Sequence, residues 1–239
     1  MFVIAHRGAS GTAPENTMAA FDKALSLKVD AIETDIQLTK DGVPVICHDQ
    51  RIDRTSDGSG FVCDYTLEEL RQFDFSGKFS SDFRGEKIPT LEQFLQRVQH
   101  EDVILNIEIK NGPIYYDGIE DQLLTLLKTY DCLGKTVVNS FDFQCLDTVR
   151  QLDPTVKIGL ILPINFAKLF DYIDLLGYTP YSLHPKSFYL TDELISGAKE
   201  RNIKVYPWSV DGRIGERVNY EALGVDGVCT NYPERFINK

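Results

Sequence analysis

Short runs rich in β-branched residues alternate with segments of helical periodicity along the whole chain of 239 residues. This alternation is typical of a parallel sheet built from strand–helix units. Eight strands are expected, at Phe2–Ala5, Ala31–Ile36, Ile104–Ile109, Thr136–Asn139, Lys157–Ile161, Tyr181–His184, Lys204–Trp208 and Gly227–Thr230. Eight such units in about 240 residues match the size of a closed (β/α)8 barrel. We therefore predict an α/β fold, a TIM barrel, that forms one domain over residues 1–239.

Two segments interrupt this regular pattern. Asp41-Gly42 lies between two strand-like runs and predicts a tight hairpin after the second strand. The stretch of about 52–88 has a glycine-rich segment, one short expected helix and a phenylalanine-rich segment, Phe73 to Phe79. We interpret this stretch as a small inserted lobe. Its phenylalanines are expected to form a core of their own, with contact to a ligand over the barrel mouth as the alternative.

Composition excludes several classes of partner. The chain has 25 basic and 36 acidic residues, a formal net charge of -11, and no basic run, which disfavours nucleic acid and anionic membranes as partners. No segment approaches the ~18 consecutive apolar residues of a membrane span, and the first strand leaves no room for a secretion signal. The five cysteines form an odd set without the spacing of a disulfide framework or a thiolate zinc site. We expect a cytoplasmic protein and leave its oligomeric state open.

Ionisable residues lie inside strands whose interior positions are normally apolar in a barrel. Glu33 and Asp35 are two residues apart on the second strand, so their side chains share one face. Glu108 and Lys110 have the same spacing at the C-terminal end of the third strand. Because barrel active sites are built at that end of the strands, these four residues are candidates for a site. A plain ion pair is the alternative for Glu108 and Lys110.

Two histidines are expected beside these carboxylates. The first strand ends in His6-Arg7-Gly8, which places His6 and Arg7 at the same rim. A two-residue turn at Asp41-Gly42 would pair Asp35 with His48 further along the hairpin. Directly opposed residues project from the same face, so this register predicts that His48 lies beside Asp35. A lone histidine is more often structural than functional, but the joint arrangement of these residues favours a functional site.

The clustered charges indicate a particular chemistry. Three neighbouring carboxylates, Glu33, Asp35 and Glu108, repel one another unless a cation is bound, and all-oxygen ligands suit Mg²⁺ or Ca²⁺ better than zinc. A divalent ion, with Arg7 and Lys110, would admit an anionic phosphate into an acidic protein. Two flanking histidines suit cleavage of a phosphodiester, in which one group accepts a proton and the other donates one.

The same residues belong to a set of motifs that resembles the glycerophosphodiester phosphodiesterase family over essentially the whole chain. The motifs are His6-Arg7-Gly8 with its continuation to Thr17, Glu33-Thr34-Asp35, Thr39-Lys40-Asp41-Gly42, His48-Asp49, Glu108-Ile109-Lys110, Trp208, and Asp226-Gly227 followed by Thr230-Asn231-Tyr232-Pro233. The opening motif alone is weak, but the ordered set is highly specific. One departure is Asp211, where members of the family often carry Asn, and it puts in doubt a polar contact at that position.

The resemblance implies a barrel enzyme that hydrolyses glycerophosphodiesters to sn-glycerol 3-phosphate and an alcohol. It implies one divalent cation, Mg²⁺ or Ca²⁺, on Glu33, Asp35 and Glu108, with His6 as general acid and His48 as general base. Substrate-binding residues would be Arg7, Lys110 and Trp208, and His184, at the end of a strand, is a further candidate. Glu15 and Asn16 are expected to shape the start of the first helix. Two alternatives stay open: a phosphodiesterase that acts on lysophospholipids, and a non-catalytic barrel that binds a phosphate ligand.

Overall fold

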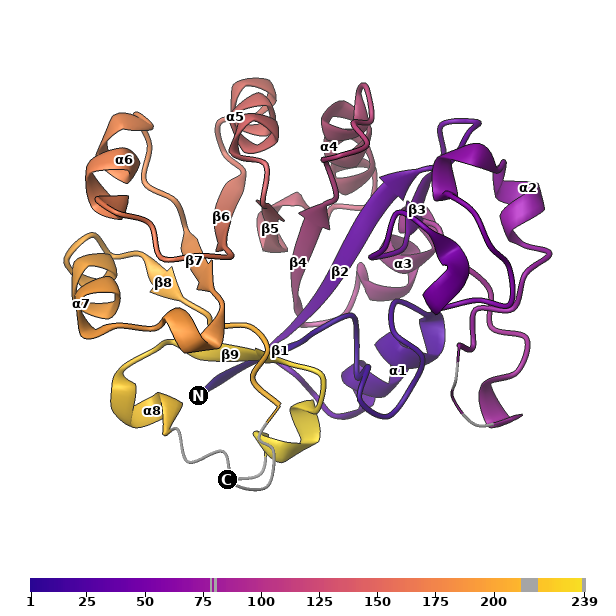
Figure 1. The fold of residues 1–239 in the computed structure, drawn as a ribbon, viewed down its shortest axis with the longest axis horizontal. Coiled ribbons are helices and arrows are strands. Elements are labelled where there is room, and N and C mark those ends of the chain that lie inside the picture. Colours follow the sequence, from indigo (N-terminus) through magenta and orange to yellow (C-terminus); the bar gives the residue numbers. More distant parts are fainter. Residues whose placement is uncertain (78, 80, 212–218, 238–239) are drawn as a thin grey trace.

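The chain folds as a barrel of parallel strands in a computed structural model that describes residues 1–77, 79, 81–211 and 219–237 (Figure 1). The strands are β1 (Phe2–Ala5), β2 (Ala31–Leu38), β4 (Ile104–Ile109), β5 (Thr136–Ser140), β6 (Lys157–Leu162), β7 (Ser182–Pro185), β8 (Lys204–Val205) and β9 (Gly227–Thr230). They are hydrogen-bonded in the order β8-β7-β6-β5-β4-β2-β1-β9. The prediction of an eight-stranded parallel barrel is therefore confirmed.

The barrel closes between β8 and β9 through single hydrogen bonds instead of a regular ladder. The backbone N–H of Asp226 donates to the carbonyl of Val205 at 3.1 Å, and that of Cys229 donates to the carbonyl of Pro207 at 2.9 Å. We expected β8 to extend to Trp208, but it ends at Val205. Pro207 has no N–H to donate, which interrupts ladder pairing at this point.

Helices surround the strands, as Figure 1 shows, and each packs its apolar face on the barrel. In the described ranges they are α1 (Met18–Ser26), α3 (Leu91–Val98), α4 (Ile119–Thr129), α5 (Phe143–Leu152), α6 (Leu169–Leu175), α7 (Asp192–Glu200) and α8 (Tyr220–Leu223), with 3₁₀ turns at Leu133–Lys135, Ser187–Tyr189 and Pro233–Arg235. Thr90 begins α3 with a capping box in which its hydroxyl accepts from the N–H of Gln93 at 3.1 Å. None of these helices has the length and apolarity of a membrane-spanning helix.

A small lobe lies between the hairpin strand β3 (Pro44–Ile46) and α3. It contains α2 (Leu67–Leu70) and 3₁₀ turns at Ile52–Arg54, Val62–Asp64 and Ser81–Phe83. Phe75 is buried in a separate apolar cluster with Ile52, Val62 and Leu70, and Phe73 packs against that cluster. These two phenylalanines thus form the expected core, whereas Phe79 is 39% exposed. Lys78 and Ser80 of this lobe, and the last two residues of the predicted domain, lie outside the described residues.

The hairpin register differs by one residue from the prediction. Ile36 pairs with Ile46 in β2 and β3, so Cys47, not His48, stands opposite Asp35. The turn has three residues because Thr39 donates its N–H to the carbonyl of Val43 at 3.1 Å. Gly42 takes a φ of +76°, the left-handed conformation that a three-residue hairpin turn requires. Since β3 ends at Ile46, strand alternation does not determine the direction of the His48 side chain.

Candidate active site

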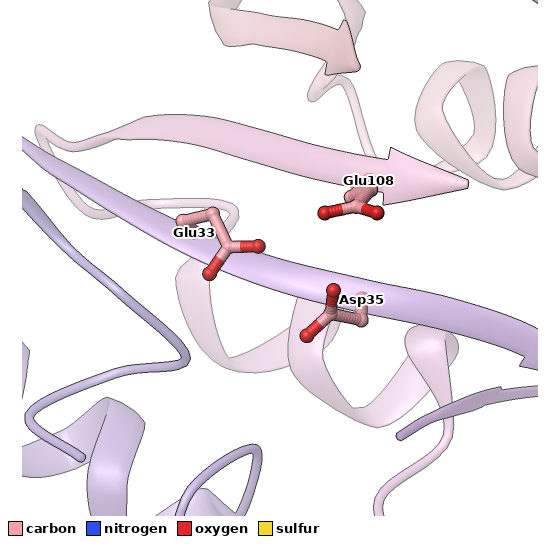
Figure 2. A group of neighbouring side chains, drawn as sticks. All are labelled: Glu33, Asp35 and Glu108. Carbon is pink, nitrogen blue, oxygen red and sulfur yellow. The ribbon is translucent and has the colours of Figure 1, made fainter. Parts of the chain in front are cut away.

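Three carboxylates meet inside the barrel, two from the middle of β2 and one from the C-terminal end of β4. Asp35 and Glu108 are direct partners in the parallel pairing of these strands, and Glu33 lies two residues before Asp35 on the same face. One oxygen from each residue lies within 4.8 Å of the others. Figure 2 shows the carboxylates of Glu33 and Asp35 on β2 turned towards that of Glu108 on β4. All three side chains are buried.

Basic and amide groups hold the carboxylates in place. The backbone N–H of Arg7 donates to Glu33 at 2.8 Å, and Lys110 Nζ donates to Glu108 at 2.6 Å. Asn16 Nδ2 donates to Asp35 at 2.8 Å. Arg7 has a φ of +58°, an uncommon conformation for a non-glycine residue, and in it the Arg7 N–H faces Glu33. The Arg7 guanidinium also lies 3.5 Å from Asp35.

The carboxyl pKa values in this cluster diverge. Burial raises the pKa of Glu33 well above its ordinary range, and the neighbouring charge of Asp35 adds to the rise. Burial likewise raises the pKa of Glu108 to about 7, against the opposing effect of Lys110. Burial acts to raise the pKa of Asp35 too, but Lys110, His48 and Arg7 lower it below its ordinary range. Without a cation, the cluster therefore retains protons near neutral pH.

The donor set fits a hard divalent cation. Oδ1 of Asp35 is buried and has no hydrogen-bond partner among the described residues, and Asp35 belongs to the cluster with Glu33 and Glu108. Carboxylate oxygens are the ligands preferred by Mg²⁺ and Ca²⁺, whereas zinc favours nitrogen and sulfur. A bound cation would satisfy the orphaned oxygen and relieve the repulsion among the three carboxylates.

His6 lies on the β9 side of the cluster. Its Nε2 is 3.9 Å from Glu33, and its Nδ1 donates to Asn231 Oδ1 at 2.7 Å. Asn231 is in turn oriented by Asp211, which accepts from its backbone N–H at 3.2 Å and from its side-chain amide at 3.4 Å. Asp211 therefore has a defined contact in this chain. Burial, followed by the charge of Arg7, lowers the pKa of His6 to about 3.

Burial lowers the pKa of His48 below its ordinary value. The charge of Asp35, which is close enough to act on the ring in spite of the shifted register, opposes this fall. The His48 Nδ1 donates to Asp49 at 2.6 Å, since a carboxylate can only accept. Arg54 of the lobe donates to Asp49 at 2.6 Å and also binds Glu15. The lobe thus contacts the carboxylate that orients His48.

The remaining predicted residues line a cavity of about 40 Å³ beside Glu33, Glu108 and His6. Trp208 and His184 are both in its wall, and the Trp208 indole N–H donates to the carbonyl of His184 at 3.1 Å. His184 Nε2 is 2.8 Å from Ser182 Oγ, and burial lowers its pKa to about 3. Gly159 leaves room for this layer, because a Cβ there would overlap the side-chain oxygen of Asn139.

Sequence reasoning missed several residues that orient the site. Glu15 and Asn16 were expected to shape the start of α1, but Thr17 is the N-cap, and Asn16 is buried against Asp35. Glu15 accepts from the Arg7 guanidinium at 2.8 Å. Their position directly after the His6-Arg7-Gly8 motif was the available signal. Asn231 belongs to the closing motif Thr230-Asn231-Tyr232-Pro233, but nothing in that motif indicated a contact with His6. Arg54 had no signal, since it reaches the site from the inserted lobe.

The chain matches the model of the Glycerophosphoryl diester phosphodiesterase family over residues 6–235. It is 42% identical over 236 residues to a glycerophosphodiester phosphodiesterase of Caldanaerobacter subterraneus, and the match covers 99% of this chain and 96% of that relative.

Solved structures of the same fold agree with this match. A phosphodiesterase of Oleispira antarctica, in complex with the product sn-glycerol-3-phosphate, superposes with a TM-score of 0.87 at 28% identity, covering 98% of this chain and 94% of that one. A glycerophosphodiester phosphodiesterase of Thermotoga maritima gives a TM-score of 0.79 at 27% identity, with coverage of 99% and 97%.

Proposed function

The chain belongs to the glycerophosphoryl diester phosphodiesterase family and is an enzyme of that activity, and from this premise we propose that it uses one divalent cation and two histidines to release sn-glycerol 3-phosphate and an alcohol. The observation that carries the proposal is the buried cluster of three carboxylates flanked by His6 and His48. The product bound by the Oleispira antarctica relative supports the choice of sn-glycerol 3-phosphate. The cytoplasmic location expected from the sequence is part of this proposal.

Glu33, Asp35 and Glu108 would hold the cation through their clustered oxygens. When bound, such a cation supplies positive charge to phosphate oxygens and lowers the pKa of an attacking hydroxyl. Cavity size and ligand flexibility decide whether a site prefers Mg²⁺ or Ca²⁺. Titration of the protein with each ion would measure the two affinities.

The histidines would supply the proton transfers. Asp49 accepts the Nδ1 proton of His48, which leaves Nε2 of that ring available to accept a proton from the attacking hydroxyl. Asn231 likewise accepts the Nδ1 proton of His6, and as general acid this ring would carry a second proton on Nε2, the nitrogen on the side of Glu33, to give to the leaving alkoxide. We assign His48 as the general base and His6 as the general acid. A carboxylate partner for His48 agrees with this choice, because it stabilises the imidazolium that a base becomes.

Positive side chains around the carboxylates would bind the substrate phosphate. Arg7 and Lys110 are both largely buried, and each lies within 3.6 Å of an oxygen of Asp35. Arg7 presents a planar fork that matches phosphate oxygens, whereas Lys110 acts as a compact point charge. Trp208 and His184, in the wall of the adjoining cavity, would contact the glycerol.

One observation favours a second substrate class, the lysophospholipids. Phe141, which is 42% exposed, packs edge-on against Trp208 with ring centroids 6.2 Å apart. Phe188, which is 65% exposed, is in the 3₁₀ turn after β7, and Lys186 Nζ lies 4.7 Å from its ring and 5.2 Å from that of Trp208. An apolar surface next to the proposed glycerol position could accept an acyl chain.

The test is release of sn-glycerol 3-phosphate from glycerophosphocholine and glycerophosphoethanolamine by the purified protein. We expect release to stop with a chelator and to return with Mg²⁺ or Ca²⁺. His6→Ala and His48→Ala should each lower turnover by roughly 10²–10⁴-fold. Release that persists in chelator would reject the metal dependence, and near-normal turnover of both variants would reject the histidine assignment. Hydrolysis of lysophosphatidylcholine alone would favour the second substrate class.

A further inference from the structure

The segment that carries His48 leaves the sheet one residue before the histidine. The last ladder contact is the hydrogen bond from the N–H of Cys47 to the carbonyl of Asp35, at 3.1 Å. Beyond it, no strand among the described residues pairs with the carbonyls of residues 47–49, although Cys47 is buried and the segment borders the active site. Buried carbonyls without donors are costly, so another group has to hold this segment.

Gln37 supplies the missing donors. Its side-chain amide nitrogen donates to the carbonyl of Cys47 at 2.7 Å and to that of Asp49 at 2.8 Å, with a longer contact of 3.3 Å to His48. Gln37 is completely buried on β2, two residues after Asp35. One side chain therefore fixes the backbone on both sides of His48 and ties it to the strand that carries Glu33 and Asp35.

Tyr116 determines which end of the Gln37 amide faces this segment. The Tyr116 hydroxyl donates to Gln37 Oε1 at 2.9 Å, so the amide nitrogen is turned to the carbonyls. Burial raises the pKa of Tyr116 and keeps the hydroxyl protonated as a donor. Tyr116 belongs to the loop between β4 and α4, which begins at Lys110. The two side chains thus connect the Lys110 loop to His48.

We propose that Gln37 and Tyr116 are positioning residues for His48, which act by holding the backbone of residues 47–49 against β2. This inference rests on the proposed role of His48 in proton transfer. The pair contacts neither the phosphate-binding side chains nor the carboxylate oxygens through any hydrogen bond of the described residues. Its loss should therefore lower kcat and leave KM nearly unchanged.

The test compares Gln37→Leu and Tyr116→Phe with the wild type. Gln37→Leu removes the donors, and a displacement of His48 by about 1 Å should lower kcat roughly 10²-fold. Tyr116→Phe removes one hydroxyl and should lower kcat about fivefold, the rate equivalent of one lost neutral hydrogen bond. KM should change less than about twofold in both. Tyr116→Phe keeps the test valid if Gln37→Leu does not fold.

A second pair of the same residue types provides the matched control. Gln96 on α3 donates to the Tyr130 hydroxyl at 2.9 Å on the outer surface of the barrel. Gln96→Leu and Tyr130→Phe should leave kcat unchanged. A general loss of activity caused by removing a glutamine–tyrosine contact would appear in these variants as well.

Two further measurements separate positioning from a structural effect. The chain has four histidines, so their ring nitrogens can be followed individually by NMR. Gln37→Leu and Tyr116→Phe should shift the ring signals of His48 and leave those of His100 and His184 in place. In a His48→Ala background, Gln37→Leu should cause no further loss of turnover, because its effect passes through His48.

Wild-type kcat and unshifted His48 signals in Tyr116→Phe and in folded Gln37→Leu would overturn the inference. The inference would also be overturned if Gln37→Leu lowered kcat by the same factor in the His48→Ala background as in the wild type. Gln37 would then act on turnover independently of His48. If His48→Ala itself retains wild-type turnover, the proposed role of His48 fails, and the NMR comparison alone decides whether the pair positions this histidine.

Discussion

Replacement of Glu108 by Gln should stabilise the cation-free protein increasingly as the pH rises. In the folded protein the pKa of Glu108 is raised to about 7, chiefly by burial, while its ordinary value is 4.5. Between these values the folded state holds a proton that the unfolded state has lost. The stability contributed by this proton is complete below pH 4.5 and disappears as the pH passes 7. An amide, which does not ionise, avoids this loss.

The size of the effect follows from the two pKa values. A rise from 4.5 to about 7 corresponds to about 3 kcal/mol, since one pKa unit equals about 1.4 kcal/mol. Most of it, about 2–3 kcal/mol, should develop between pH 5 and pH 8. For a chain of this length, that difference moves the unfolding temperature by roughly 5–10 °C.

The assay is urea unfolding of wild type and Glu108→Gln in chelator at pH 5, 6, 7 and 8. The quantity compared is the difference in the free energy of unfolding between the two proteins at each pH. This is necessary because burial lowers the pKa of His6 and His184 to about 3, so the stability of both proteins rises up to about pH 6.5 for this separate reason. With saturating Mg²⁺ or Ca²⁺ the order should reverse, since the amide introduced by Glu108→Gln lacks a charged ligand oxygen. A difference that stays constant from pH 5 to 8 in chelator would refute the reasoning.

Three other substitutions test the site. Asp49→Asn should lower kcat roughly 10–100-fold without unfolding the protein, because the carboxylate that orients His48 is lost. Steady-state kinetics at pH 7 would measure this change, and an unchanged kcat would contradict the prediction. Gly159→Ala should lower the free energy of unfolding in urea by about 1–3 kcal/mol, because the added Cβ overlaps the Asn139 side chain. Equal stability of the two proteins would show that the barrel interior is packed more loosely than described. Arg54→Ala should lower kcat about threefold to tenfold, because Arg54 acts through Asp49, and it should lower the free energy of unfolding by less than about 1 kcal/mol. A change confined to KM would argue against this action of Arg54 through Asp49.

The strand pattern was sufficient to predict the barrel and the face on which the acidic residues lie. Residues two apart on a strand share a face whatever the rest of the chain does, so Glu33 with Asp35 and Glu108 with Lys110 could be grouped without coordinates. Barrel geometry then places strand ends at one rim, which brought His6 into the same prediction. The cluster of carboxylates in the structure agrees with this local reasoning.

The register of the hairpin could not be predicted from the local sequence. Asp41-Gly42 signalled a turn, but the number of turn residues depends on the backbone conformation of Gly42 and on the bonds that Thr39 makes. One extra residue moved Cys47 opposite Asp35. His48 is still near Asp35, because a buried amide on β2 holds its segment after the strand has ended.

The periodicity of each strand was enough to derive the fold class, the acidic face of β2 and β4 and the residue types available for catalysis. The orientation of the catalytic candidates, in contrast, depends on contacts between distant parts of the folded chain. Asn231 reaches His6 from the far end of the chain, and Tyr116 reaches Gln37 across 79 positions. Such contacts depend on the register between strands and on the course of loops, which a local pattern of side chains does not encode.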